Sequence, residues 1–122
     1  MDRQKQAEAV RSLNDRFRSN VPGVTDVPGR VMLTQGIRTL TDDEAEPGKL
    51  LPQLFKAVRD FETFDENNDP YQEHDFGAFD FEGEKVFWKI DYYAPDLLHG
   101  SEDPADTAKT VRVLTVMLAS EY

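Results

Sequence analysis

Two β-type runs, residues 74–81 and 84–93, are joined by Glu82-Gly83, and this feature constrains the fold more than any other. A two-residue connection that contains glycine is typical of a tight β-hairpin. On the face that carries the only tryptophan, this loop opposes Phe79 to Val86, Gly77 to Trp88, and Asp75 to Ile90. On the other face it opposes Asp80 to Lys85, Ala78 to Phe87, Phe76 to Lys89, and His74 to Asp91. A glycine across from the bulky tryptophan, and opposite charges across from each other, favour this register.

Helical spacing of apolar residues predicts two helices before the hairpin, over residues 2–19 and 50–61. Between them, the β-rich run of residues 30–37 predicts a strand that ends near Gly36. A third helix is predicted over residues 103–118, because Asp103 suits an N-cap and proline follows it at the first helical position. The order is therefore α-β-α-β-β-α. This order predicts an α+β fold, with a small, mostly antiparallel sheet of about three strands around the hairpin, packed with about three helices. The length of 122 residues predicts a single domain over residues 1–122.

Composition narrows the classes of function. The chain has 24 acidic and 14 basic residues, a net charge of −10, and no cysteine. Disulfides and thiolate chemistry are therefore excluded, and no cofactor is expected. No apolar run approaches the roughly 20 residues that a membrane span needs, so we expect a cytoplasmic protein.

Residues 60–84 contain ten carboxylates and no lysine or arginine. This charge argues against nucleic acid as a direct ligand and suits a basic protein surface.

Several short motifs occur along most of the chain: residues 13–18 (Leu-Asn-Asp-Arg-Phe-Arg), 68–70 (Asn-Asp-Pro), 73–79 (Glu-His-Asp-Phe-Gly-Ala-Phe), 87–93 (Phe-Trp-Lys-Ile-Asp-Tyr-Tyr), 103–106 (Asp-Pro-Ala-Asp), 112–115 (Arg-Val-Leu-Thr), 117–119 (Met-Leu-Ala) and 121–122 (Glu-Tyr). With these motifs the chain resembles the small bacterial family DUF3768, a domain of unknown function. The resemblance implies a bacterial protein, often encoded on a plasmid or prophage. It implies no reaction and no catalytic residues.

One candidate for catalysis is centred on His74, Asp75 and Asp91. A carboxylate that orients an imidazole can form part of a general-base device, or support a metal-bound histidine in a hydrolase. The alternative is a structural hydrogen bond between His74 and Asp91 across the hairpin.

A second candidate is a weak cation site. Asp65, Asn67 and Asp69 alternate like the first ligands of a calcium loop. The position that needs glycine holds Pro70, however, and the position that needs a bidentate glutamate holds Phe76. On this interpretation the chain is an uncharacterised structural domain with weak cation binding in the loop of residues 65–73. An Asx-rich turn without a bound cation is the other explanation of these residues.

The acidic segment predicts a protein-binding role. Carboxylates along a loop and hairpin can imitate the charge spacing of a nucleic acid backbone. We therefore predict a small acidic accessory protein, in its most specific form a DNA-mimicking inhibitor of a bacterial defence complex of the CRISPR or restriction type. The predicted contacts are Asp65, Glu66, Asp69, Tyr71, Glu73, Glu82 and Phe87. A charge run is also typical of a solvated face, which is the simpler interpretation.

Overall fold

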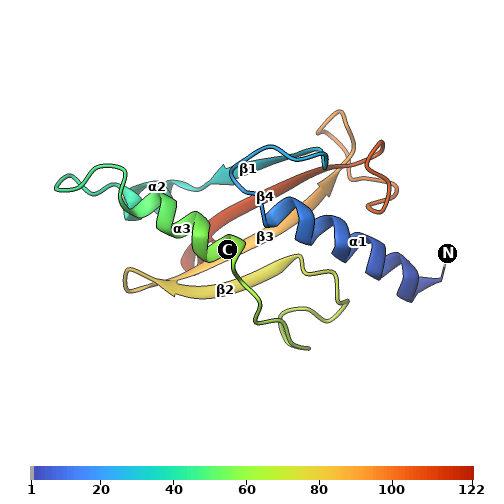
Figure 1. Cartoon of the computed structure of the whole chain (residues 1–122), viewed down its shortest axis with the longest axis horizontal. Helices are drawn as coiled ribbons and strands as arrows, with labels where there is room; N and C mark the ends of the chain where they lie inside the picture. Colours follow the sequence, from blue (N-terminus) through green and yellow to red (C-terminus); the bar gives the residue numbers. More distant parts are fainter. Residues whose placement is uncertain (1) are drawn as a thin grey trace.

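The computed structural model of the protein describes residues 2–122. In chain order its elements are α1 (Arg3–Arg18), β1 (Gly29–Leu33), α2 (Gln35–Thr41), α3 (Leu50–Arg59), β2 (Phe76–Phe81), β3 (Glu84–Tyr93), β4 (Val111–Leu118) and the 3-10 helix η1 (Ala119–Glu121) (Figure 1). The four strands form one sheet in the order β1-β4-β3-β2. β1 runs parallel to β4, whereas β4 with β3 and β3 with β2 are antiparallel. The predicted α+β class is confirmed, with four strands rather than about three.

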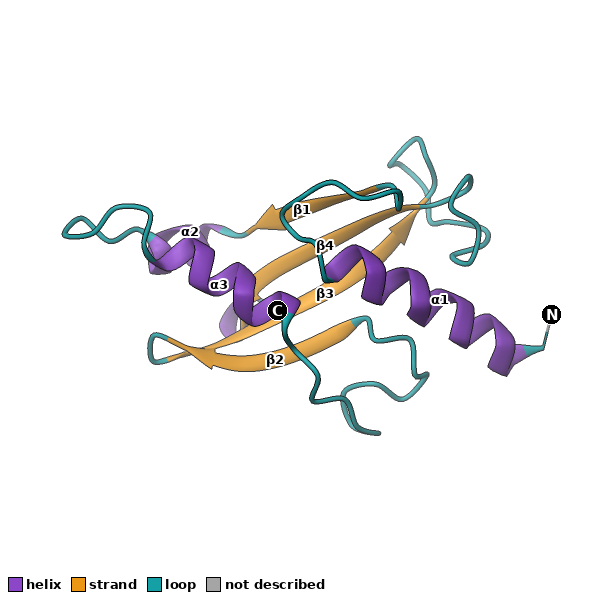
Figure 2. Ribbon diagram, viewed as in Figure 1, coloured by secondary structure: helices purple, strands orange, loops and turns teal. Residues whose placement is uncertain are grey.

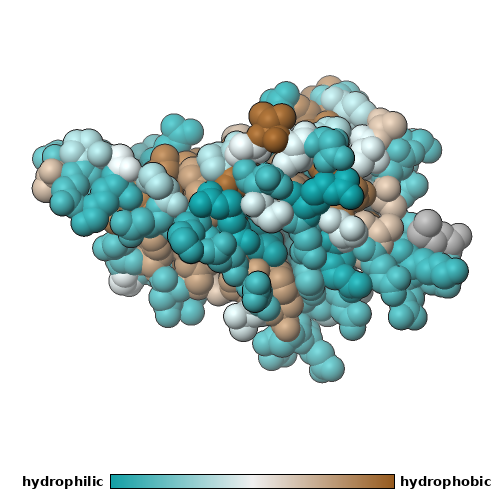
Figure 3. All heavy atoms as spheres, in the orientation of Figure 1, coloured by the Kyte–Doolittle hydropathy of each residue, from teal (hydrophilic) through white to brown (hydrophobic). Residues whose placement is uncertain are grey.

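The hydrophobic core lies between the sheet and the helices. Figure 2 shows α1 and α3 on one face of the sheet. Alternate residues of β3, namely Val86, Trp88 and Ile90, are buried on that face, next to Leu114 and Val116 of β4. These residues pack against helix side chains that include Phe17, Ile37, Leu54, Phe55 and Val58. The helices turn their polar sides to solvent, and this face of the molecule is largely hydrophilic in Figure 3.

The predicted hairpin register is confirmed from residue 76 to the turn. The observed pairs are Phe76 with Lys89, Gly77 with Trp88, Ala78 with Phe87, Phe79 with Val86, and Asp80 with Lys85. Glu82 and Gly83 have φ angles of 50° and 79°. Positive φ at both central residues is what a type I′ hairpin turn requires. The hairpin therefore forms as its sequence predicts.

The predicted helix over residues 103–118 is wrong, because residues 111–118 form β4 in the middle of the sheet. Apolar residues occur on both faces of β4, although burial alternates along it, so the run lacks the period-two pattern that predicts a strand. The β-branched Val111, Val113, Thr115 and Val116 are the residues that favour a strand. The Asp103 carboxylate accepts a hydrogen bond from the Ala105 amide at 3.1 Å and forms an Asx turn instead of a helix N-cap.

The strand predicted to run from residue 30 to about Gly36 is too long. β1 ends at Leu33, and the Thr34 side chain caps a short helix, α2, by accepting a hydrogen bond from the Ile37 amide. The other two predicted helices correspond to α1 and α3, with ends that differ by two residues or fewer. Within residues 2–122, no helix is both long and apolar enough to cross a membrane.

Candidate functional site

The part of the acidic segment that lies between α3 and β2, residues 60–75, folds around Asp69. This residue is only 5% exposed. Its Oδ1 atom accepts hydrogen bonds from the backbone amides of Glu73 at 2.9 Å and His74 at 3.0 Å. The chain turns sharply here, with φ angles of 58° at Gln72 and 55° at His74. Asp69 therefore stabilises this turn and is not one of the exposed charges that the sequence predicted for partner contact.

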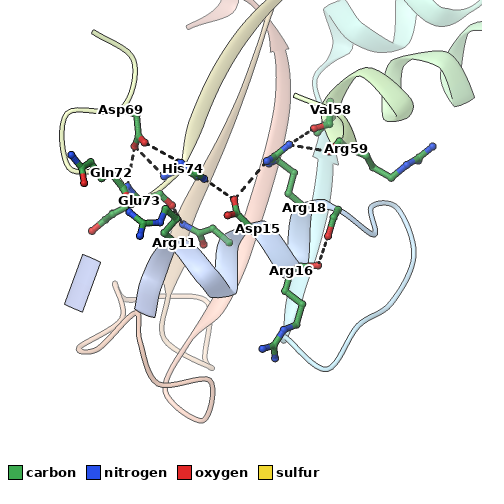
Figure 4. Close-up of polar contacts among 12 residues, drawn as sticks. Arg11, Asp15, Arg16, Arg18, Val58, Arg59, Asp69, Gln72, Glu73 and His74 are labelled. Carbon is green, nitrogen blue, oxygen red and sulfur yellow. Dashed lines mark hydrogen bonds and ion pairs between the residues drawn. The ribbon is translucent and has the colours of Figure 1, made fainter. Parts of the chain in front are cut away.

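His74 joins this turn to α1. Its Nδ1 atom lies 2.8 Å from Oδ1 of Asp15, and its Nε2 atom lies 3.6 Å from Oδ2 of Asp69. Its ring stacks on Phe64, with the centroids 3.8 Å apart and the planes 5° from parallel. Figure 4 shows His74 between the two carboxylates.

The predicted pair of His74 and Asp91 does not form. The positive φ of His74 takes the residue out of the strand before the register would place it opposite Asp91. Asp91 instead contacts Lys89 on its own strand, at 2.7 Å. The His74 imidazole therefore pairs with Asp15 and Asp69, and forms no hydrogen bond or ion pair with Asp75 or Asp91.

Arg18 extends the same chain of contacts to α3. It is 5% exposed, and its Nη1 atom donates hydrogen bonds to the carbonyl oxygens of Val58 at 2.7 Å and Arg59 at 3.2 Å. Its guanidinium group lies over the Trp88 ring, 4.9 Å from the centroid, which is a cation–π distance. Burial lowers the pKa of Arg18, and the nearby Asp15 carboxylate, 3.6 Å away, opposes this effect. The acidic segment is thus held by α1, and α1 is held by α3 (Figure 4).

A second buried polar network fixes α1 to the sheet. Asn14 is fully buried; its amide donates to the Glu73 carbonyl oxygen at 2.9 Å and to the Tyr92 hydroxyl at 2.8 Å. Its oxygen accepts a hydrogen bond from Nε of Arg112 at 2.6 Å. The Tyr92 hydroxyl in turn donates to the Glu73 carboxylate at 3.2 Å, and burial raises the pKa of Tyr92. Glu73 is therefore part of this network rather than a free surface charge.

The sequence interpretation missed both Asn14 and Arg112. The signal in the sequence was a polar residue at a position where the neighbouring residues on the same face are apolar. Asn14 lies on the apolar side of α1, between the buried Val10 and Phe17, and Arg112 lies inside the apolar run of β4. Buried polar groups need hydrogen-bond partners, so such positions indicate a network.

A cavity of about 550 Å³ opens where β2 begins. Its lining includes Asp75, Phe76, Lys89, Asp91 and Tyr122. Burial, with the negative charges of Glu73 and Asp69, raises the pKa of the Asp75 carboxyl group to about 6. Two residues of the predicted catalytic set, Asp75 and Asp91, therefore share one cavity.

The predicted cation-site residues lie in a compact turn. Oδ1 of Asp65 accepts hydrogen bonds from the backbone amides of Asn67 at 2.8 Å and Asn68 at 3.1 Å, which is an Asx turn. Asp69 points inward to the amides described above. Within residues 2–122, no three histidine, cysteine, aspartate or glutamate side chains are grouped so that they could hold a metal ion.

The remaining predicted contact residues differ in exposure. Asp65, Glu66 and Glu82 are exposed, and Tyr71 is 74% exposed. Phe87 is half-buried on the sheet face away from the helices, where its ring contacts Phe76 and Tyr122, with centroids 5.1 and 5.7 Å from its own. Asp65 and Glu66 follow α3, whereas Glu82 lies in the hairpin turn at the other end of β2 (Figure 1).

These features define an α+β domain with its helices on one sheet face and an acidic segment along one edge of the sheet. The family model of DUF3768, described as a protein of unknown function, matches residues 33–121. The chain belongs to this family, as its motifs indicated. The matched region contains the hairpin, β4 and the acidic segment, and α1 precedes it. Comparisons with curated proteins and with solved structures found no match.

Proposed function

We propose that this protein binds a basic surface of another protein through the exposed carboxylates of residues 60–84. One observation carries the proposal: ten carboxylates occur in this stretch without a lysine or arginine. Seven of them are exposed: Asp60, Glu62, Asp65, Glu66, Asp80, Glu82 and Glu84. Lys56 and Lys85 pair with Asp60 and Asp80, which leaves five exposed carboxylates without an ion pair among the described residues. Such a surface attracts a basic partner over distances of about a Debye length.

The framework beneath the surface supports a binding role. Asp69, His74 and Asp15 hold the acidic loop against α1 through contacts of 3.6 Å or less. A loop that is already ordered loses less conformational entropy when it binds. The exposed carboxylates of the loop are therefore presented in a fixed arrangement.

In its most specific form, the partner is a nucleic-acid-binding protein whose basic channel the carboxylates occupy. Proteins that bind nucleic acid neutralise phosphates with lysine and arginine, and the same side chains attract carboxylates. An inhibitor of a defence complex of the CRISPR or restriction type would act in this way. The separation of the loop and hairpin charges along β2 supports contact at two points of such a channel.

The test is a pull-down from a bacterial lysate with two variants of equal charge. Glu62→Gln, Glu66→Gln and Glu82→Gln together neutralise three exposed side chains of the acidic segment. The matched control, Asp42→Asn, Glu44→Gln and Glu102→Gln, neutralises three exposed side chains elsewhere. The proposal predicts a salt-sensitive partner that the first variant loses and the control retains. Equal capture by both variants would contradict it.

A second candidate function, acid–base catalysis in the Asp75 cavity, is favoured by the raised pKa of Asp75. A carboxyl group with a pKa of about 6 can give or take a proton close to neutral pH. Lys89 and Asp91 line the same cavity and are the groups available to orient a substrate. Hydrolysis of a screened ester or phosphoester that Asp75→Asn abolishes, and that Asp80→Asn preserves, would support catalysis. Equal rates for both variants would contradict it.

A further inference from the structure

The outer edge of β2 has free backbone hydrogen-bonding groups. β2 is at the end of the strand order, so only β3 pairs with it. The Ile90 amide donates a hydrogen bond to the Asp75 carbonyl oxygen at 2.8 Å. In an antiparallel pair, the backbone amide and carbonyl groups of every second residue from Asp75 onward therefore point towards β3. Phe76, Ala78 and Asp80 therefore direct their amide and carbonyl groups outward. Among residues 2–122 no other segment forms a backbone hydrogen bond with these three residues, and Figure 2 shows β2 along the border of the sheet.

The sequence of β2 favours strand pairing. Phe-Gly-Ala-Phe-Asp-Phe contains neither proline nor lysine, the residues that commonly protect an edge strand. Three of its six residues are phenylalanine, which is common in strands. A partner strand would also meet the aromatic group on the open face, where the half-buried Phe76 and Phe87 contact the exposed Tyr122.

Charge decides which strand can pair there. Asp65 and Glu66 lie beyond the start of β2, and Glu82 and Glu84 lie at its end. In a pair of two copies through β2, the carboxylates at each end of β2 would lie next to carboxylates of the other copy, so like-charge repulsion opposes self-pairing. An extended segment rich in lysine or arginine meets attraction at both ends.

We propose that β2 accepts an extended basic segment of the partner protein as a fifth strand, with one lysine or arginine entering the cavity at the start of β2. This inference rests on the proposed function and names its mode of binding. Backbone hydrogen bonds to Phe76, Ala78 and Asp80 supply affinity, and alternate side chains supply specificity. Lys89 already pairs with Asp91 in this cavity, at 2.7 Å. Asp65 and Asp75 line the cavity with Phe76 and Tyr122, so an entering cation meets these two carboxylates and the aromatic rings.

The test uses a labelled peptide of alternating lysine and valine with blocked ends, and measures binding by fluorescence anisotropy. Ala78→Pro removes an outward-facing amide and no hydrogen bond to β3, which is a position that tolerates proline. We expect this variant to bind the peptide at least about tenfold more weakly, because it loses a donor and the proline ring obstructs the added strand. A peptide with alternate backbone amides methylated keeps its charge and loses its donors. It should bind the unaltered protein with a similar loss, which tests the inference even if Ala78→Pro fails to fold.

The outcomes separate this inference from the proposed function. Strand addition is supported if both the proline variant and the methylated peptide lose binding. It is overturned if both bind as tightly as the originals. If the Glu62→Gln, Glu66→Gln, Glu82→Gln variant alone loses binding, the acidic surface binds basic segments by charge and not as a strand. If the unaltered protein does not bind the peptide, strand addition is overturned, and the lysate pull-down decides the proposed function independently.

Discussion

Replacing Asn14 with alanine should remove the buried connection between α1, the acidic segment and the sheet. Asn14 is fully buried and makes three hydrogen bonds of 2.6 to 2.9 Å: to Glu73, Tyr92 and Arg112. A buried polar group that loses its partner costs about 1–3 kcal/mol. The Arg112 guanidinium is fully buried, and its Nη1 atom has no partner within residues 2–122. Because the three losses share one network, we expect the free energy of unfolding to fall by about 3–5 kcal/mol in total.

The assay is urea unfolding followed by the fluorescence of Trp88, the only tryptophan, which is fully buried. The matched control is Asn20→Ala. Asn20 is exposed and makes one side-chain hydrogen bond, to the Arg16 carbonyl oxygen. Its loss should cost less than about 1 kcal/mol. If Asn14→Ala is as stable as the control variant, the network does not hold α1 to the sheet and the reasoning is refuted.

Three further substitutions test other parts of the structure. His74→Ala removes the contacts with Asp15 and Phe64, so the free energy of unfolding should fall by roughly 1–3 kcal/mol in urea titrations; unchanged stability would contradict the bridging role. Gly77→Ala places a methyl group where the Trp88 indole lies, so the same titrations should show a loss of about 1–3 kcal/mol, and full stability would show that the indole moves freely. Asp75 has a folded-state pKa of about 6, above its ordinary 3.8, so the folded chain keeps a proton that the unfolded chain has released, and stability should fall as pH rises from about 4 to 6. Asp75→Asn should remove this pH dependence and, after allowance for solvent screening, stabilise the protein at pH 7 by about 1 kcal/mol; an unchanged pH profile would contradict the assignment.

The hairpin was predictable because its pattern is local. A two-residue turn with glycine defines the register, and the glycine opposite Trp88 agrees with it. β4 was not predictable in the same way. It is flanked by β1 and β3, and apolar residues occur on both of its faces, so its composition resembles that of a buried helix. The nearby Asp103 and Pro104 strengthened the wrong choice, because residues that begin helices also form turns.

The candidate site was predictable in composition but not in geometry. The sequence indicated that residues 60–84 are acidic, but not that Asp69 turns inward to cap two backbone amides. The positive φ of His74 takes the imidazole away from Asp91 and towards Asp15. It was not expected, because the β-type pattern of residues 74–81 placed His74 inside the strand. The contact joins positions far apart in the chain, so it depends on where α1 packs.

The most direct test of the central claim is competition for a purified partner. The partner captured by the lysate experiment is mixed with labelled duplex nucleic acid, this protein is titrated in, and the anisotropy of the label is measured. If the carboxylates of residues 60–84 occupy a basic nucleic-acid-binding surface, the label is released, and the Glu62→Gln, Glu66→Gln, Glu82→Gln variant releases it only at higher concentration. A partner that holds the nucleic acid and this protein at the same time would contradict the claim.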